Sequence, residues 1–265
     1  MFTGWPAGER IGSVLVVSRV TTSMQWVFGL FGLSVTRQRP ANRFDAMSES
    51  LSRLAPAGFV PTMIIDAGAN RGEWAVKAAR AFPQVPLHLI EPQTACRPAL
   101  LAFGSTRGSV EIYSTVVTRP GCASVRMSDA TSGSTGAHVL RDVERGEDER
   151  RLPATTLDEL FAHRVAATDR VLLKLDLEGH ELIALEGARA LLPHVEVLVT
   201  ETCFFLSEPD SGPTCCDVLA VLSQSGFELY DVAALASRPR DGRLRIGDLM
   251  FVRRDSVLLG DNRWV

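Results

Sequence analysis

The sequence predicts an α/β protein built on a mostly parallel sheet, with an antiparallel final strand and a helical N-terminal extension. Two features of the chain after residue 62 predict this fold. Short apolar runs alternate with longer mixed segments, which is the pattern of β–α–β crossovers in a parallel sheet. The last two apolar runs follow each other without a helical segment between them, so we expect an antiparallel pair there.

Each element is predicted from its local pattern. Short runs rich in aliphatic and β-branched residues indicate buried strands at residues 63–67, 87–91, 110–117, 171–175, 195–200, 227–232 and 248–253. The mixed segments between them indicate helices at residues 73–82, 94–103, 156–163, 181–192 and 214–225. Thr155 or Thr156 can cap the third helix, and Gly226 follows the last one.

Composition limits the class of protein. The 265 residues allow one large domain or two small ones, and 46% hydrophobic with 22% charged residues is ordinary for a globular core. The formal net charge of −3 lacks the basic excess of proteins that read phosphates, so we expect no nucleic-acid partner. The five cysteines form no C-x-x-C pair, and we expect reduced thiols in a cytoplasmic protein.

We divide the chain into a helical leader, residues 1–60, and a main domain, residues 61–265. Polar residues interrupt the apolar stretch 13–35, so it contains no clean span of about 20 apolar residues. The leader is expected to pack on the main domain, or to touch the inner membrane face as an amphipathic segment followed by several arginines. The Gly-, Ser- and Arg-rich residues 118–151 break the α/β rhythm and are expected to form a lid or insertion.

The most specific local pattern is IIDAGANRGEW, residues 64–74. A strand ends at Asp66, and Gly68, Asn70 and Gly72 alternate through a turn into a helix. Glycine permits close approach of the backbone to a ligand, and asparagine tolerates the dihedral angles of such a turn. Glu91, at the end of the next strand, is placed to accept hydrogen bonds from ribose hydroxyls.

These residues indicate a nucleoside-binding turn rather than a dinucleotide fingerprint. Counting G-x-G-x-x-G from Gly68 requires a glycine at residue 73, which is Glu73. The acid Asp66 would repel a pyrophosphate but suits a ligand with a positively charged amine. We therefore expect S-adenosylmethionine rather than NAD, and a purely structural turn is the remaining alternative.

The chain resembles the FkbM-type methyltransferases from about residue 63 to residue 254. Besides IIDAGANRGEW, the similar segments are HLIEP (88–92), TTLDEL (155–160), LLKLDLEGHELIALEGA (172–188), VLVTE (197–201) and the tail GFELYDV…DGRLRIGDLMFVR (226–253). The resemblance implies a Rossmann-like class I methyltransferase fold and O-methylation of sugar, glycolipid or polyketide-type hydroxyls. It also implies that S-adenosylmethionine is bound by Asp66, Gly68, Asn70, Gly72 and Glu91.

The candidate catalytic groups are Asp176, Glu178 and His180 of KLDLEGHE, residues 174–181, together with Glu201. The family's K-x-D-x-E-G block matches Asp176, Glu178 and Gly179, whereas His180 lies where the family varies. Parallel strands bring Asp176 and Glu201 to one sheet edge, at the switch point. One hypothesis makes Asp176, Glu178 or His180 the base that deprotonates the acceptor.

Two further interpretations of the same acids stay open. Asp176 and Glu201, with or without Glu178, can hold Mg²⁺, which lowers the pKa of a bound hydroxyl. Alternatively Asp176 and Glu178 cap the following helix, or Lys174 forms a structural ion pair with Asp176 on one strand face.

Two other functions compete with methyl transfer for the protein as a whole. One is a non-catalytic module that binds S-adenosylmethionine or a nucleotide and serves a partner enzyme, and the other is an NAD-dependent oxidoreductase.

Overall fold

The computed structural model describes residues 43–128, 133–140, 149–206, 212–261 and 263. They belong to one compact unit, Arg43–Val265. Most of the predicted leader, residues 1–42, lies outside the described residues, and its last part contains helix α2 (Arg43–Leu54). Within the described residues, no helix is both long and apolar enough to cross a membrane.

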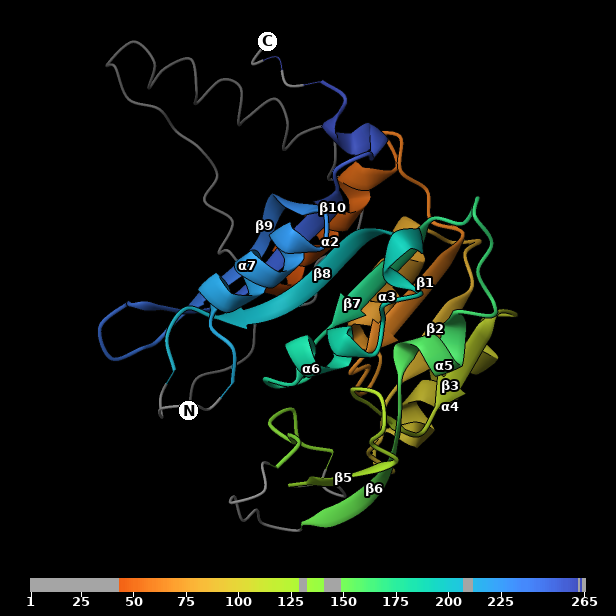
Figure 1. The fold of residues 1–265 in the computed structure, drawn as a ribbon, viewed down its shortest axis with the longest axis vertical. Helices are drawn as coiled ribbons and strands as arrows, with labels where there is room; N and C mark the ends of the chain where they lie inside the picture. Colours follow the sequence, from red (N-terminus) through yellow and green to blue (C-terminus); the bar gives the residue numbers. More distant parts are fainter. Residues whose placement is uncertain (1–42, 129–132, 141–148, 207–211, 262, 264–265) are drawn as a thin grey trace, which may run out of the picture. The chain divides into compact units, whose positions relative to one another are not determined.

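A seven-stranded sheet forms the centre of this unit (Figure 1). Its order is β3-β2-β1-β7-β8-β10-β9, and β10 runs antiparallel to both of its neighbours. The strands are β1 (Met63–Ala67), β2 (Leu87–Ile90), β3 (Val110–Tyr113), β7 (Val171–Leu175), β8 (Val195–Cys203), β9 (Phe227–Ser237) and β10 (Leu244–Arg253). This topology confirms the predicted Rossmann-like α/β fold. The final strand inserts between β8 and β9 and does not lie at the sheet edge.

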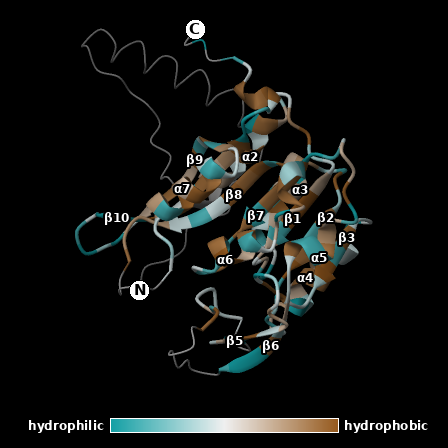
Figure 2. Ribbon diagram, viewed as in Figure 1, coloured by the Kyte–Doolittle hydropathy of each residue, from teal (hydrophilic) through white to brown (hydrophobic). Residues whose placement is uncertain are grey.

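Helices cover both faces of the sheet. The other helices are α3 (Glu73–Ala81), α4 (Arg97–Ser105), α5 (Leu157–Phe161), α6 (Glu181–Glu186) and α7 (Cys215–Gln224), with short 3-10 turns η1 (Leu192–His194) and η2 (Val257–Leu259). Leu172 of β7 packs in one core with α2, α3 and α4, whereas Leu173 packs in a second core with α5, α6 and α7. Successive residues of the strand thus pack into the cores on opposite faces of the sheet, as a strand buried on both faces requires. Figure 2 shows hydrophobic colour along the central strands β1 and β7.

The predicted single strand at residues 110–117 is wrong, because the chain divides there between two sheets. β3 pairs with β2, whereas β4 (Val116–Val117) pairs with β6 (Arg150–Thr155) in a small sheet of order β4-β6-β5. Its third strand is β5 (Ser124–Met127), antiparallel to β6. The segment predicted as a lid or insertion, residues 118–151, therefore contributes strand structure of its own.

The helix predicted at residues 181–192 ends at Glu186 because the chain packs too closely there. A Cβ atom on Gly187 would lie 2.3 Å from the carbonyl oxygen of Thr118. The chain turns at this contact, and the carboxylate of Asp158 accepts the N–H groups of Ala190 and Leu191. Asp158 lies in the first turn of α5, so it joins that helix to the chain after α6.

Candidate active site

The turn after β1 is built by backbone contacts that only small residues allow. Gly68, Asn70 and Gly72 all have positive φ angles, of 81°, 44° and 86°. A Cβ atom on Gly68 would lie 1.9 Å from the carbonyl oxygen of Asp176, at the end of β7. The turn is therefore pressed directly against the KLDLEGHE segment, and a larger residue at Gly68 has no room.

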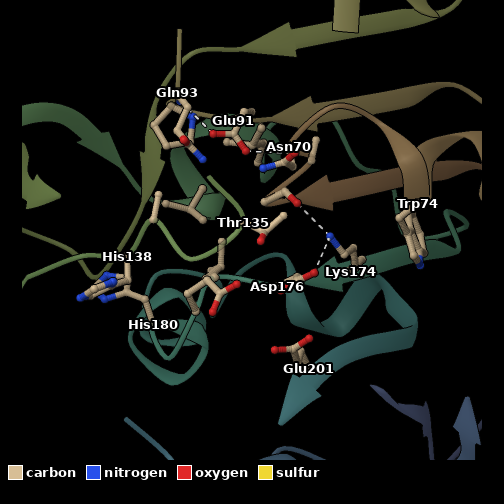
Figure 3. Close-up of a pocket in the computed structure, with 18 of the residues that line it drawn as sticks. Asn70, Trp74, Glu91, Gln93, Thr135, His138, Lys174, Asp176, His180 and Glu201 are labelled. Carbon is tan, nitrogen blue, oxygen red and sulfur yellow. Dashed lines mark hydrogen bonds and ion pairs between the residues drawn. The ribbon is translucent and has the colours of Figure 1, made fainter. Parts of the chain in front are cut away.

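Glu91 holds this turn and also faces a cavity. One carboxylate oxygen accepts the N–H of Asn70 and the other accepts the N–H of Gln93, both at 2.8 Å (Figure 3). Burial raises the pKa of Glu91, and the two hydrogen bonds oppose that effect. A carboxylate offers about four acceptor positions. Because Glu91 lines the cavity, the acceptor positions left over can bind hydroxyl groups of a ligand.

A buried ion pair joins β1 to β7 behind the turn. The ammonium of Lys174 lies 3.0 Å from Asp66 and 3.3 Å from Asp176, and it donates to the carbonyl oxygen of Gly68 at 2.9 Å. The ion pair predicted from strand alternation is therefore present. Asp66, predicted as a cofactor ligand, is 0% exposed and is not among the residues that line the cavity. In this structure its carboxylate faces the lysine.

Three predicted acids converge at the carboxyl ends of β7 and β8. One carboxylate oxygen from each of Asp176, Glu178 and Glu201 lies within 4.8 Å of the others. All three residues line the same cavity, as does Asp248 of β10, which is paired in register with Glu201. The sequence-based expectation that these strand ends form one acidic rim agrees with this placement.

The segment between Asp176 and α6 is held by a residue that the sequence analysis did not single out. Glu181 is buried, and one of its carboxylate oxygens accepts the N–H groups of Leu177 at 2.8 Å and Gly179 at 3.2 Å. Burial raises the pKa of Glu181 to about 7. Glu178, at the centre of this turn, has a positive φ of 53° and is exposed. Glu181 thus holds the turn between β7 and α6, and α6 has no side-chain cap at its N-cap residue His180.

His180 is buried rather than a surface group. It is 8% exposed, and its Nε2 lies 3.1 Å from the hydroxyl of Thr118. Burial, helped by the charge of Arg119, lowers the pKa of His180 to about 4. The imidazole is therefore neutral near pH 7. It lines the cavity as a hydrogen-bonding group.

One cavity of about 480 Å³ connects these groups. Figure 3 shows Glu91 and Asn70 on one side of it, with Asp176 and Glu201 on the other. The wall also contains residues that the sequence analysis did not identify, namely Met47, Trp74, Lys77, Gln93, Ser134, Thr135, Ala137, His138, Val139 and Ile246. Gln93 was identifiable in principle, because it follows Glu91 by two residues. Residues 134–139 gave no such signal, since only the small sheet brings them to the cavity.

Comparison with known proteins identifies the family. The sequence model described as "Methyltransferase FkbM domain" matches residues 66–229, which is more than half of the chain. No curated protein matches the chain significantly.

Three solved structures with a similar trace are distant in sequence. Magnesium protoporphyrin IX methyltransferase from Synechocystis PCC 6803, solved with bound SAM, is 12% identical over 93% of this chain and 100% of its own, with a TM-score of 0.43. The 1,6-didemethyltoxoflavin-N1-methyltransferase of Burkholderia thailandensis is 11% identical over 94% of each chain, with a TM-score of 0.46. An O-methyltransferase family protein from Burkholderia thailandensis is 14% identical over 79% of this chain and 55% of its own, with a TM-score of 0.44.

The family match covers the glycine turn, Glu91, the KLDLEGHE segment and Glu201. It favours methyl transfer over the two competing functions, an NAD-dependent oxidoreductase and a binding module. With the strand order described above, the fold is that of the class I methyltransferases. The chain belongs to the FkbM family of methyltransferases.

Proposed function

We propose that the protein transfers a methyl group from S-adenosylmethionine to a hydroxyl group of a small molecule of the sugar, glycolipid or polyketide type. The observation that carries the proposal is the shared cavity. Glu91, whose carboxylate suits ribose hydroxyls, and the acids Asp176, Glu178 and Glu201 line the same space of about 480 Å³. That volume is within the range of small-molecule sites.

The cofactor side of the cavity fits a nucleoside. Gly68 and Asn70 line the wall, and Glu91 keeps acceptor positions beyond the two that bind the turn. When bound, S-adenosylmethionine supplies an electrophilic methyl group on a positively charged sulfur. Asp66 is too deeply buried to line the space. It forms an ion pair with Lys174, which also pairs with Asp176 at the cavity wall.

The acidic rim supports the acceptor side of the reaction. Methyl transfer in line requires an oriented hydroxyl and a group that takes up its proton. Asp176, Glu178 and Glu201 are carboxylates at one edge of the cavity, so they can both orient and deprotonate a hydroxyl. His180 is neutral and bonded to Thr118, which suits hydrogen bonding to the acceptor better than uptake of a proton.

The three carboxylates also fit a hard divalent cation such as Mg²⁺, which prefers oxygen ligands. In that version of the mechanism the cation lowers the pKa of the acceptor hydroxyl, and the carboxylates only hold it. The two versions differ in one measurement. Activity that disappears with EDTA and returns with Mg²⁺ supports the cation, whereas activity unaffected by EDTA leaves proton uptake to the carboxylates.

The proposed cofactor is tested by thermal unfolding of the full chain with S-adenosylhomocysteine, with NAD and without ligand, because a ligand of the native state raises Tm. We expect stabilisation by S-adenosylhomocysteine alone. Glu91→Gln should abolish most of that shift, since it removes the charged acceptor. The exposed Glu186→Gln is a matched charge control and should leave the shift intact. Stabilisation by NAD alone would refute the proposal.

The predicted membrane contact of the leader is a separate proposal with its own test. Flotation of liposomes is compared for the full chain and for a chain that begins at residue 43, where the described unit starts. We expect the full chain to float more strongly. Equal flotation of both chains removes the leader from membrane binding.

A further inference from the structure

Gln93 lies directly beside the carboxylate that suits ribose hydroxyls. Its backbone N–H donates to Glu91 at 2.8 Å, and the residue lines the cavity (Figure 3). Gln93 is only 3% exposed, so its side chain is enclosed by the cavity wall rather than extended into solvent. A polar atom of this side chain that has no partner in the protein is therefore placed to contact a bound nucleoside.

The side-chain amide of Gln93 has a defined orientation. Its nitrogen donates to the carbonyl oxygen of Ser134 at 3.0 Å. A carbonyl oxygen only accepts hydrogen bonds, so the flipped amide would set two acceptors against each other. The amide oxygen, Oε1, is therefore the end of the side chain that Ser134 does not engage.

This amide oxygen is also unsatisfied. Among the described residues that line the cavity, the buried side-chain atoms without a hydrogen-bond partner are Oε1 of Gln93 and Nε1 of Trp74. Burial of an acceptor without a partner costs free energy, so native proteins keep few such atoms. An unsatisfied acceptor in the wall of a binding cavity is stabilised by a ligand that brings a donor.

The chemistry of adenosine limits which group can be that donor. The ribose has hydroxyl groups, and the base has one exocyclic amine, whereas the ring nitrogens of adenine accept hydrogen bonds. Glu91 keeps acceptor positions for the hydroxyls beyond the two that bind the N–H groups of Asn70 and Gln93. The uncharged amide oxygen of Gln93 is then left for the uncharged amine of the base.

The wall around Gln93 has the composition of a site for a flat base. Ile90 and Pro92 precede it in the chain and line the cavity, and Ala137 lines it from the segment that Gln93 binds through Ser134. Small-molecule sites combine such apolar walls with a few placed polar groups that fix the orientation of the ligand. Gln93 is a polar group of this kind at the edge of the apolar wall.

We propose that Gln93 determines the specificity for the base of the cofactor, because its amide oxygen accepts a hydrogen bond from the exocyclic amine of adenine. The inference rests on the proposed S-adenosylmethionine-dependent function and adds a residue that selects the cofactor. It assigns Gln93 no part in proton transfer. A base with a carbonyl oxygen in place of the amine would meet Gln93 acceptor against acceptor, and it should bind more weakly.

Two ligands that differ at this position of the base test the proposal. S-adenosylhomocysteine carries the amine, and S-inosylhomocysteine carries a carbonyl oxygen in its place. The Kd of each ligand is measured by calorimetry with the full chain. We expect the wild type to bind S-inosylhomocysteine at least about tenfold more weakly than S-adenosylhomocysteine.

Two variants of Gln93 separate recognition of the base from support of the segment that contains Ser134. Gln93→Met and Gln93→Glu both lose the donor to Ser134, but only Gln93→Glu keeps acceptor oxygens. The ratio of the two Kd values should fall below about threefold in Gln93→Met and stay near the wild-type ratio in Gln93→Glu. As a control, Trp74→Phe removes the other unsatisfied atom, on a ring beside Lys174, and should leave the ratio unchanged.

The outcomes distinguish this inference from the proposed function. If the wild type binds neither ligand, the proposed cofactor and the role of Gln93 are both refuted. If it binds S-adenosylhomocysteine without preference over S-inosylhomocysteine, only the role of Gln93 is refuted. A preference that persists in Gln93→Met also refutes that role, because another group then recognises the amine. The wild-type preference is decisive even if a substitution at Gln93 prevents folding, which is checked by Tm.

Discussion

The ammonium of Lys174 on β7 lies 3.0 Å from the carboxylate of Asp66 on the neighbouring strand β1, and both side chains are buried. The same ammonium contacts Asp176 at the cavity edge and the carbonyl oxygen of Gly68 in the turn. Burial by itself lowers the pKa of Lys174, but the two carboxylates outweigh burial and raise it. The ammonium of Lys174 thus joins the turn after β1 to Asp176 of the acidic rim.

Removal of the Lys174 ammonium should strongly destabilise the protein. In Lys174→Met the buried carboxylate of Asp66 loses its counter-charge, and we expect a loss of about 3–5 kcal/mol in the free energy of unfolding, measured with urea. Lys77→Met removes a half-buried lysine from the same cavity wall and should cost much less. The double variant with Asp66→Asn should recover part of the loss. No recovery would show that the ion pair is not the cause.

Gly68 should tolerate no side chain. Gly68→Ala places a Cβ atom 1.9 Å from the backbone of Asp176, and we expect a loss of more than about 3 kcal/mol together with loss of S-adenosylhomocysteine binding. Gly121 has nearly the same φ, 80° against 81°, but a Cβ atom there would meet no other atom within 4 Å. Gly121→Ala therefore isolates the dihedral cost, about 1–2 kcal/mol. Equal losses would contradict the role of close packing.

Glu181 should make stability depend on pH. Its pKa is about 7 in the folded protein and 4.5 in its ordinary state, so the folded protein binds more protons between those values. The free energy of unfolding should therefore fall as pH rises from about 4.5 to about 7, by at most about 3 kcal/mol. Glu181→Gln keeps a carbonyl acceptor for Leu177 and Gly179 but removes the charge.

The measurement for Glu181 is urea unfolding of the wild type and Glu181→Gln at several pH values between 4.5 and 8. The difference between the two proteins isolates this carboxyl from other titrating groups. We expect the variant to gain relative stability as pH rises. A constant difference across the range would show that Glu181 does not titrate there.

The rim acids and His180 should differ in their effect on turnover once a hydroxyl acceptor is identified. Asp176→Asn keeps shape but removes a charge, and we expect a loss of about 10²-fold or more in kcat if the carboxylate takes up the proton. His180→Gln keeps hydrogen bonding toward Thr118 and should cost less. Formation of S-adenosylhomocysteine is the readout. A larger loss for His180→Gln would transfer the role of base to the imidazole.

Local pattern predicted the elements around the glycine turn well because apolar runs and glycine and asparagine positions suffice to indicate them. The strand at residues 63–67, the positive φ angles after it and the strand at 171–175 all follow from short-range chemistry. The helix predicted to reach residue 192 failed because its end is decided by contact between Gly187 and Thr118, residues far apart in the chain. The strand predicted at 110–117 failed because its second half finds a partner in β6.

The candidate site shows the same division between local and long-range causes. The sequence by itself determined the α/β fold, the glycine turn, Glu91 and the set of acids at the ends of the strands, because residue type and strand periodicity suffice for these. Only the tertiary structure decided that Asp66 is the buried counter-ion of Lys174 and that Glu181 holds the KLDLEGHE turn. It also decided that Ser134, Thr135 and residues 137–139 line the cavity. Burial and ion pairing depend on contacts between segments that are distant in the sequence, and local sequence patterns do not specify these contacts.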